Sequence, residues 1–301
     1  MRINFLTKCI ATLAITAGVA LAICFAKTNS LPTSKMSESA VTLQLGDPSL
    51  SKITGLKTDN HPTGMDFYEA DFSQADHQTI TIESGKNSFQ VNNVISLMGA
   101  ADKDVPGGIF EWKSTSTFSD KQVESPEVAR DGMMQILARL EAAGWRRFID
   151  NESPRLTGEQ AWHYGTSAEG KGVYPLDPSY KPDLEEWRAG EDSMPSWTLY
   201  ANGTYIEISL QASGMAGVAG KKTYLVNIDV KNEYAFYALG YFPGDSEKMR
   251  HWEKYIPAVL AKAHAKRLAT EATLKAQGYT IDTTYEDPPI KALQDAAGKP
   301  E

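Results

Sequence analysis

The sequence predicts an α+β fold, in which antiparallel β-meander sheets pack against one or two long helices. Runs that alternate apolar and polar residues occur at 78–82, 88–91 and 109–112, and the first two flank a Ser-Gly-Lys-Asn turn. Two long stretches in which apolar residues recur at helical spacing, 126–144 and 246–277, follow such runs. Runs of strands that end in a long helix are the element order of an α+β protein.

Both long helices carry residues typical of helix boundaries or breaks. Ser125 suits the N-cap of the first helix, and Pro126 suits its first helical position. Gly144 is placed to end that helix, because glycine readily adopts the left-handed conformation found after helix ends. Pro257 is expected to kink or split the second helix. The first helix is supported by apolar residues at helical spacing: Met133, Ile136, Leu137 and Leu140.

The second half of the chain predicts a hairpin and a further meander. Asn202-Gly203 lies between two alternating runs, 197–200 and 204–210, and Asn-Gly in this position is the strongest short-range signal of a hairpin. Residues 224–230 and 234–241 are predicted to continue the meander as strands.

The end of each long helix is followed by a similar sequence. Residues 140–154 correspond to residues 274–288. Each segment has a glycine followed by an aromatic residue, and each ends in a proline that lies two residues after a glutamate. One explanation is a duplication, with two related α+β halves at 61–154 and 155–290. The other is that any helix closed by glycine and followed by a strand has this pattern.

Residues 1–26 have the composition of an export signal. Arg2 and Lys8 flank the start of an uncharged run from Cys9 to Ala26. The run is predicted to be a cleaved signal peptide, a retained membrane anchor, or a lipoprotein signal with Cys24 as the lipidated residue. The positive-inside rule then predicts a periplasmic protein, either free or tethered to the membrane by residues 9–26.

The remaining chain is predicted to comprise a flexible spacer at 27–60, one globular domain at 61–290 and a polar tail at 291–301. The whole chain has a net charge of −8, and because both charged residues of the first 26 are basic, the rest is more acidic still. This charge argues against nucleic acid as a partner. No cysteine follows Cys24, which excludes disulfides, thiol catalysis and cysteine-based zinc sites from the rest of the chain.

No catalytic constellation is found. Gly244-Asp245-Ser246 resembles the start of a lipase block, but Asp-Ser between a strand and a helix is an ordinary N-cap. Residues 214–223 lack the glycine and hydroxyl positions of a phosphate-binding loop and are predicted to be a hairpin loop. No two histidines are four residues apart. The sequence therefore predicts no enzyme, no metal site and no cofactor; the histidines are His61, His77, His163, His251 and His264.

The long connection at 150–196 is the candidate binding site. Thr157 and Gln160 fit a capping box for a short helix at 161–164, and another short helix is predicted at 183–188. Long connections in compact domains are commonly functional, and Tyr, Trp and Arg dominate binding hot spots. The alternative is that Tyr174 and Trp187 only fasten the connection to the core. The candidate partner-binding residues are Tyr174, Asp177, Tyr180, Asp183, Glu185, Glu186, Trp187 and Arg188.

The layout of residues 144–162, 174–187 and 196–210 resembles periplasmic immunity proteins of type VI secretion toxin–immunity pairs, the lipase-neutralising members above all. The resemblance implies a protein that covers the active site of a cognate toxin, such as a phospholipase, and loses binding when Tyr180 or Trp187 is replaced by alanine. A second class is a periplasmic module that binds a small molecule or lipid without catalysis. A third, an exported hydrolase, would need a nucleophile and base that the sequence does not offer.

Overall fold

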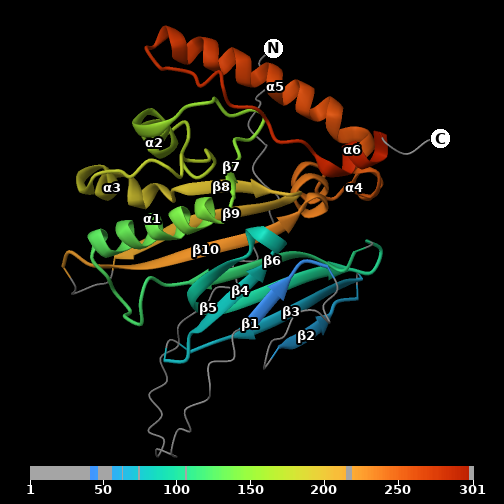
Figure 1. Ribbon diagram of the computed structural model, residues 1–301, viewed down its shortest axis with the longest axis horizontal. Coiled ribbons are helices and arrows are strands. Elements are labelled where there is room, and N and C mark those ends of the chain that lie inside the picture. Colours follow the sequence, from blue (N-terminus) through green and yellow to red (C-terminus); the bar gives the residue numbers. More distant parts are fainter. Residues whose placement is uncertain are drawn as a thin grey trace, which may run out of the picture.

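The structure is a computed structural model that describes residues 41–46, 56–62, 64–73, 75–105, 107–214 and 219–297. The predicted export segment at 1–26 lies outside the described residues. One ten-stranded, mostly antiparallel sheet is packed by helices, which confirms the α+β fold (Figure 1). The strands are β1 (Val41–Gln44), β2 (Lys57–Asn60), β3 (Met65–Asp71), β4 (Gln78–Glu83), β5 (Phe89–Asp102), β6 (Ile109–Ser116), β7 (Arg146–Arg147), β8 (Ser196–Ala201), β9 (Thr204–Gly214) and β10 (Lys222–Asn232).

The sheet joins the two halves of the chain through its central strands. Its order is β1-β4-β5-β6-β10-β9-β8-β7, with β3 pairing a further part of β5 and β2 pairing β3. The predicted Asn202-Gly203 hairpin is confirmed, since both residues have positive φ and Ala201 pairs with Thr204. Gly214 pairs with Lys222, so the predicted hairpin between β9 and β10 is also present, while residues 215–218 lie outside the described part.

Part of the predicted spacer belongs to the sheet. β1 pairs in parallel with β4, and its Val41 and Leu43 are buried in the main core. Backbone hydrogen bonds in both directions join Gly46 to Ile109, and the indole nitrogen of Trp112 donates to the carbonyl of Gln44. The prediction of a spacer throughout 27–60 is therefore wrong for β1 and β2. The alternation of β1 covers only four residues, too few to stand out, and β2 has no apolar residue.

The first helix has the predicted boundaries. In α1 (Pro126–Ala142), the Ser125 hydroxyl accepts a hydrogen bond from the Val128 N–H, and Gly144 follows the helix with φ of 89°. Its apolar face is buried in the main core, which also contains the inward residues of β8, β9 and β10. The connection carries α2 (Gly158–Thr166), α3 (Leu184–Gly190) and the 3-10 turn η3 (Glu191–Ser193).

The second long helix breaks at a different place from the one predicted. α4 (Ser246–Arg250) and α5 (Trp252–Ala276) meet at His251, whose ψ of 36° leaves the helical region. Pro257 lies inside α5, close enough to its start that few backbone hydrogen bonds are lost. Figure 1 shows α5 and the β1–β6 part of the sheet at opposite ends of the molecule.

Two predictions near the C-terminus are wrong. Residues 234–239, predicted as part of a strand, form a π-helical turn whose Tyr237 and Ala238 are buried in a second, aromatic core. The Asn232 side chain accepts from the Ala235 N–H and starts this turn. The predicted polar tail contains α6 (Lys291–Ala297), and the Glu233 carboxylate accepts from its first two N–H groups. In both places tertiary packing overrides the local pattern.

The two similar helix ends have the same hydrogen bonds. Trp145 N–H donates to the Leu140 carbonyl, and Tyr279 N–H donates to the Leu274 carbonyl, both at 3.0 Å. Each half also supplies three antiparallel strands, β4-β5-β6 and β8-β9-β10, which meet at β6 and β10. The halves share one sheet and do not form separate domains. Among the described residues, no helix has both the length and the apolar composition needed to cross a membrane.

Candidate functional site

The connection at 150–196 is folded firmly onto the core. The rings of Trp162 on α2 and Trp187 on α3 stack with centroids 5.9 Å apart and an interplanar angle of 17°. The Tyr174 hydroxyl donates to the Pro154 carbonyl at 3.0 Å and accepts from Arg147. Burial raises the pKa of Tyr174, so its hydroxyl stays protonated as this donor.

Two of the predicted partner-binding residues are therefore not on the surface. Tyr174 and Trp187 are 2% and 0% exposed, so neither can touch a partner in this conformation. The alternative that they fasten the connection to the core is correct for both. Their aromatic character signalled burial as strongly as binding, and the sequence could not separate the two.

The other six predicted residues lie in or just before α3: Asp177 and Tyr180 in the preceding loop, Asp183 as its N-cap, and Glu185, Glu186 and Arg188 within it. The Asp177 carboxylate accepts from the N–H groups of Gly158 and Ser179, and although burial raises the pKa of Asp177, these hydrogen bonds hold it below its usual value. Arg188 is exposed and pairs with Glu127 of α1 at 3.0 Å. The predicted capping box at Thr157 is absent, because Gln160 instead accepts from the Thr280 N–H and Thr157 makes no side-chain cap.

The start of α3 has the capping box that α2 lacks. The Asp183 carboxylate accepts from the Glu186 N–H, and the Glu186 carboxylate accepts from the Asp183 N–H, each at 2.8 Å. The Tyr180 hydroxyl also donates to Glu186. Burial and the Glu186 carboxylate raise the pKa of Tyr180, which keeps the hydroxyl protonated. Glu185, the neighbouring residue, points to solvent.

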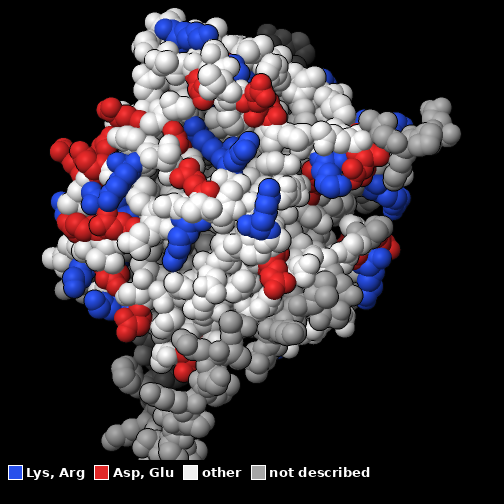
Figure 2. Space-filling model, viewed as in Figure 1, with Lys and Arg blue, Asp and Glu red and all other residues white. Residues whose placement is uncertain are grey.

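A cleft of about 510 Å³ lies between α2 and α3. Eight residues line it, of which six are polar and three of those are acidic: Trp162, His163, Thr166, Ser167, Asp183, Glu185, Glu186 and Ala189. Figure 2 shows acidic side chains gathered at the edge of the molecule where α2 and α3 lie, with basic side chains among them. We call the face formed by the exposed Glu159, His163, Asp183 and Glu185 and the half-buried Glu186 the α2–α3 surface.

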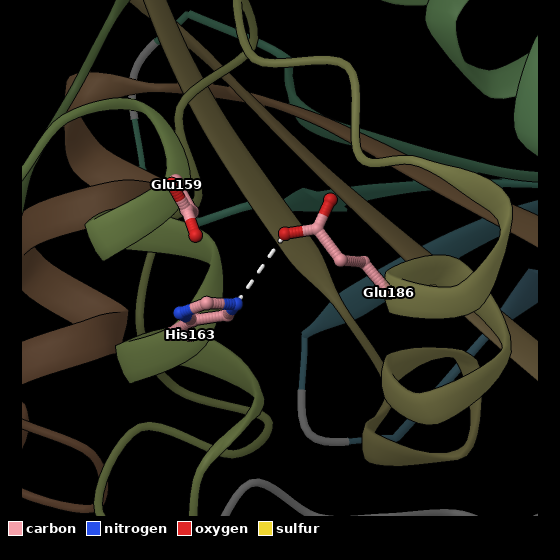
Figure 3. A group of neighbouring side chains, drawn as sticks. All are labelled: Glu159, His163 and Glu186. Carbon is pink, nitrogen blue, oxygen red and sulfur yellow. Dashed lines mark ion pairs between the residues drawn. The ribbon is translucent and has the colours of Figure 1, made fainter.

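Three side chains of this surface converge although the sequence analysis assigned no role to two of them. Glu159 and His163 are four residues apart on α2, and Glu186 lies opposite on α3 (Figure 3). One ligand atom from each lies within 4.8 Å of the others, and His163 Nε2 is 3.3 Å from Glu186 Oε1. The Glu-x-x-x-His spacing on a helix was the available signal, but the third residue comes from tertiary contact.

The residues considered for lipase chemistry have a structural role. The Asp245 side chain accepts from the Lys248 N–H at 3.1 Å and so caps α4, as predicted. His251 pairs with Glu247 on the same short helix at 3.9 Å and lies at the junction of α4 and α5. Comparisons of this chain with protein-family models, with curated proteins and with solved structures find no match.

Proposed function

We propose that the protein is an exported binding protein without catalytic activity, which docks its α2–α3 surface onto a basic surface of a partner protein. The observation that carries the proposal is a pair of helices held in one position by buried aromatic rings, with acidic side chains exposed on their outer side. Trp162 and Trp187 fix the two helices against each other from below, while Glu159, Asp183 and Glu185 remain exposed above them. A surface already held in one conformation loses little entropy on binding.

The links to α1 add to this rigidity. Lys181 pairs with Asp131 at 3.1 Å and Arg188 pairs with Glu127 at 3.0 Å, so both sides of the capping box at Asp183 are tied to the same helix. Ion pairs as exposed as these contribute little stability one by one, but they restrict the orientation of α3. The helices that carry the acidic side chains are therefore held in a fixed arrangement.

The resemblance to periplasmic immunity proteins makes a co-encoded secreted toxin, such as a phospholipase, the partner that we propose. An acidic surface speeds association with a basic one, and the effect weakens with salt. The second candidate, a small-molecule or lipid-binding module, is less well supported. The α2–α3 cleft has three carboxylates among its eight lining residues, and covering a carboxylate with an apolar ligand costs free energy.

The test uses the full chain as bait in its native host, followed by binding kinetics with the captured partner. Glu185→Lys should slow association by about tenfold at low salt, with a smaller effect at high salt. Glu69→Lys, which makes the same charge change at an exposed residue of β3 in the β1–β6 part of the sheet, is the matched control. Equal binding by both variants, or no captured partner under any growth condition, would contradict the proposal.

A further inference from the structure

The Glu159, His163 and Glu186 side chains converge on a point at the mouth of the α2–α3 cleft. Figure 3 shows the carboxylates of Glu159 and Glu186, from two different helices, directed toward the His163 ring, with Glu186 paired to its Nε2. Imidazole nitrogen and carboxylate oxygen are common ligands of Zn²⁺, which binds them at about 2.0–2.2 Å. We propose that these three residues form a Zn²⁺ site that joins α2 to α3.

The geometry is close to what zinc requires. In a tetrahedral site with such bond lengths, neighbouring ligand atoms are about 3.4 Å apart. His163 Nε2 and Glu186 Oε1 are already 3.3 Å apart. All three ligand atoms lie within 4.8 Å of one another, and Glu159 is exposed, so a change of its side-chain rotamer brings its oxygen to the required distance.

Glu186 is held in position by groups that are not ligands. Its Oε2 accepts from the Asp183 N–H at 2.8 Å, while the Tyr180 hydroxyl lies within 2.9 Å of both carboxylate oxygens. The oxygen nearer His163 therefore keeps a lone pair directed to the cleft. Hydrogen bonds that orient a ligating carboxylate in this way are a regular feature of metal sites.

The local charge also favours a dication. A protonated His163 could balance only one of the two carboxylates. The nearby cations are engaged elsewhere, since Lys181 pairs with Asp131 and Arg188 pairs with Glu127. Zn²⁺ would balance Glu159 and Glu186 together. His163 and Glu186 line the α2–α3 cleft, so water can reach a metal ion bound there.

The test is a titration of the full chain with Zn²⁺, followed by calorimetry and by thermal unfolding, with no partner protein present. The wild-type protein should bind one Zn²⁺ at this site and unfold at a higher temperature when zinc is added. His163→Ala and Glu186→Gln should each weaken this binding by at least tenfold. Tyr180→Phe, which removes only the hydroxyl that orients Glu186, should weaken it by about 10- to 100-fold.

Two matched controls separate this site from incidental zinc binding. His251→Ala removes a histidine that pairs with Glu247, four residues before it, and Glu185→Gln neutralises the neighbour of Glu186. Both variants should keep the wild-type affinity. Glu186→Gln preserves an acceptor for the capping box, so its unfolding temperature without zinc should stay near that of the wild type. Wild-type affinity in His163→Ala, or no zinc binding by the wild type, would overturn the proposal. Neither result depends on the proposed partner.

Discussion

The indole rings of Trp162 and Trp187 stack on each other beneath the α2–α3 surface, with an angle of 17° between their planes. Gly190 allows this packing, because a Cβ at that position would lie 2.8 Å from the Trp162 ring. Both tryptophans belong to the main hydrophobic core. The helices α2 and α3 thus bury aromatic rings on their inner side and expose acidic side chains on their outer side.

Replacing Trp187 by alanine is expected to lower the free energy of unfolding by about 3–5 kcal/mol, because it leaves a cavity in the core and removes the stacked ring. Chemical denaturation measures the change. Arg188→Ala, which alters the adjacent exposed side chain, should cost about 1 kcal/mol or less. If Trp187→Ala kept wild-type stability, the ring could not be a core residue and the burial in this structure would be contradicted.

Glu271 on α5 and Arg155 in the connection form a buried ion pair. Two hydrogen bonds of 2.8 Å join their side chains, and Glu271 also accepts from the Arg155 N–H. Glu271→Ala should cost about 3–5 kcal/mol of stability, because it leaves Arg155 without a partner. Lys266 lies on the same helix as Glu271 and forms an exposed pair with Glu152. Lys266→Ala breaks this pair and should cost less than about 1 kcal/mol.

The same pair predicts a pH dependence. Burial raises the pKa of Glu271, but the hydrogen bonds from Arg155 lower it by more. The net pKa is therefore below that of an ordinary glutamate. Its contribution to stability is therefore complete above the unfolded-state pKa and is lost as pH falls through the folded-state pKa. The difference in stability between wild type and Glu271→Ala, measured from pH 7 down to pH 2, should shrink in the acid range.

Asp229 on β10 should show the opposite pH dependence. Burial raises its pKa to about 6, although Lys231 and Lys113 lower it. A raised carboxyl pKa means that the folded protein holds the proton more tightly, so wild-type stability should fall by about 2 kcal/mol, relative to Asp229→Asn, as pH rises from 4 to 6. Denaturation of both proteins across this range measures the difference. A constant difference would show that Asp229 titrates normally.

Gly144 and Gly278 end α1 and α5 with the same left-handed backbone, at φ of 89° and 94°. Alanine at either position should cost about 1–3 kcal/mol. The cost should be greater at Gly144, because a Cβ there would lie 2.8 Å from the Asn87 amide nitrogen, whereas the space at Gly278 is open. Thermal unfolding of the two alanine variants compares them directly, and equal losses would show that the Asn87 side chain moves aside without penalty.

Local signals predicted the elements that local chemistry determines. The Asn202-Gly203 turn and the Ser125 cap depend on residues next to one another, and both are present as expected. The π-helical turn at 234–239 was predicted as a strand because its aromatic residues favour strands, yet they pack into the core on several sides of the turn. Whether the export segment, the partner and the immunity role are as proposed stays a prediction.

The surface position of the candidate residues was predictable only in part. The sequence located it in the 150–196 connection, and Asp183, Glu185 and Glu186 do lie on its surface. The convergence of His163 with Glu186 could not be predicted, because it depends on the stacking that brings α3 against α2. Burial of an aromatic residue is likewise decided by packing between distant segments.

The central position of β10 determines when the sheet can form. β6 pairs with β5 but gains its second partner only after residues 222–232 are available, and until then it exposes unpaired backbone groups along one edge. Contacts between segments so far apart in sequence close slowly. A chain that crosses a membrane from its N-terminus would therefore carry an incomplete sheet until its last third emerges, and this interval is when aggregation threatens it and a chaperone would protect it.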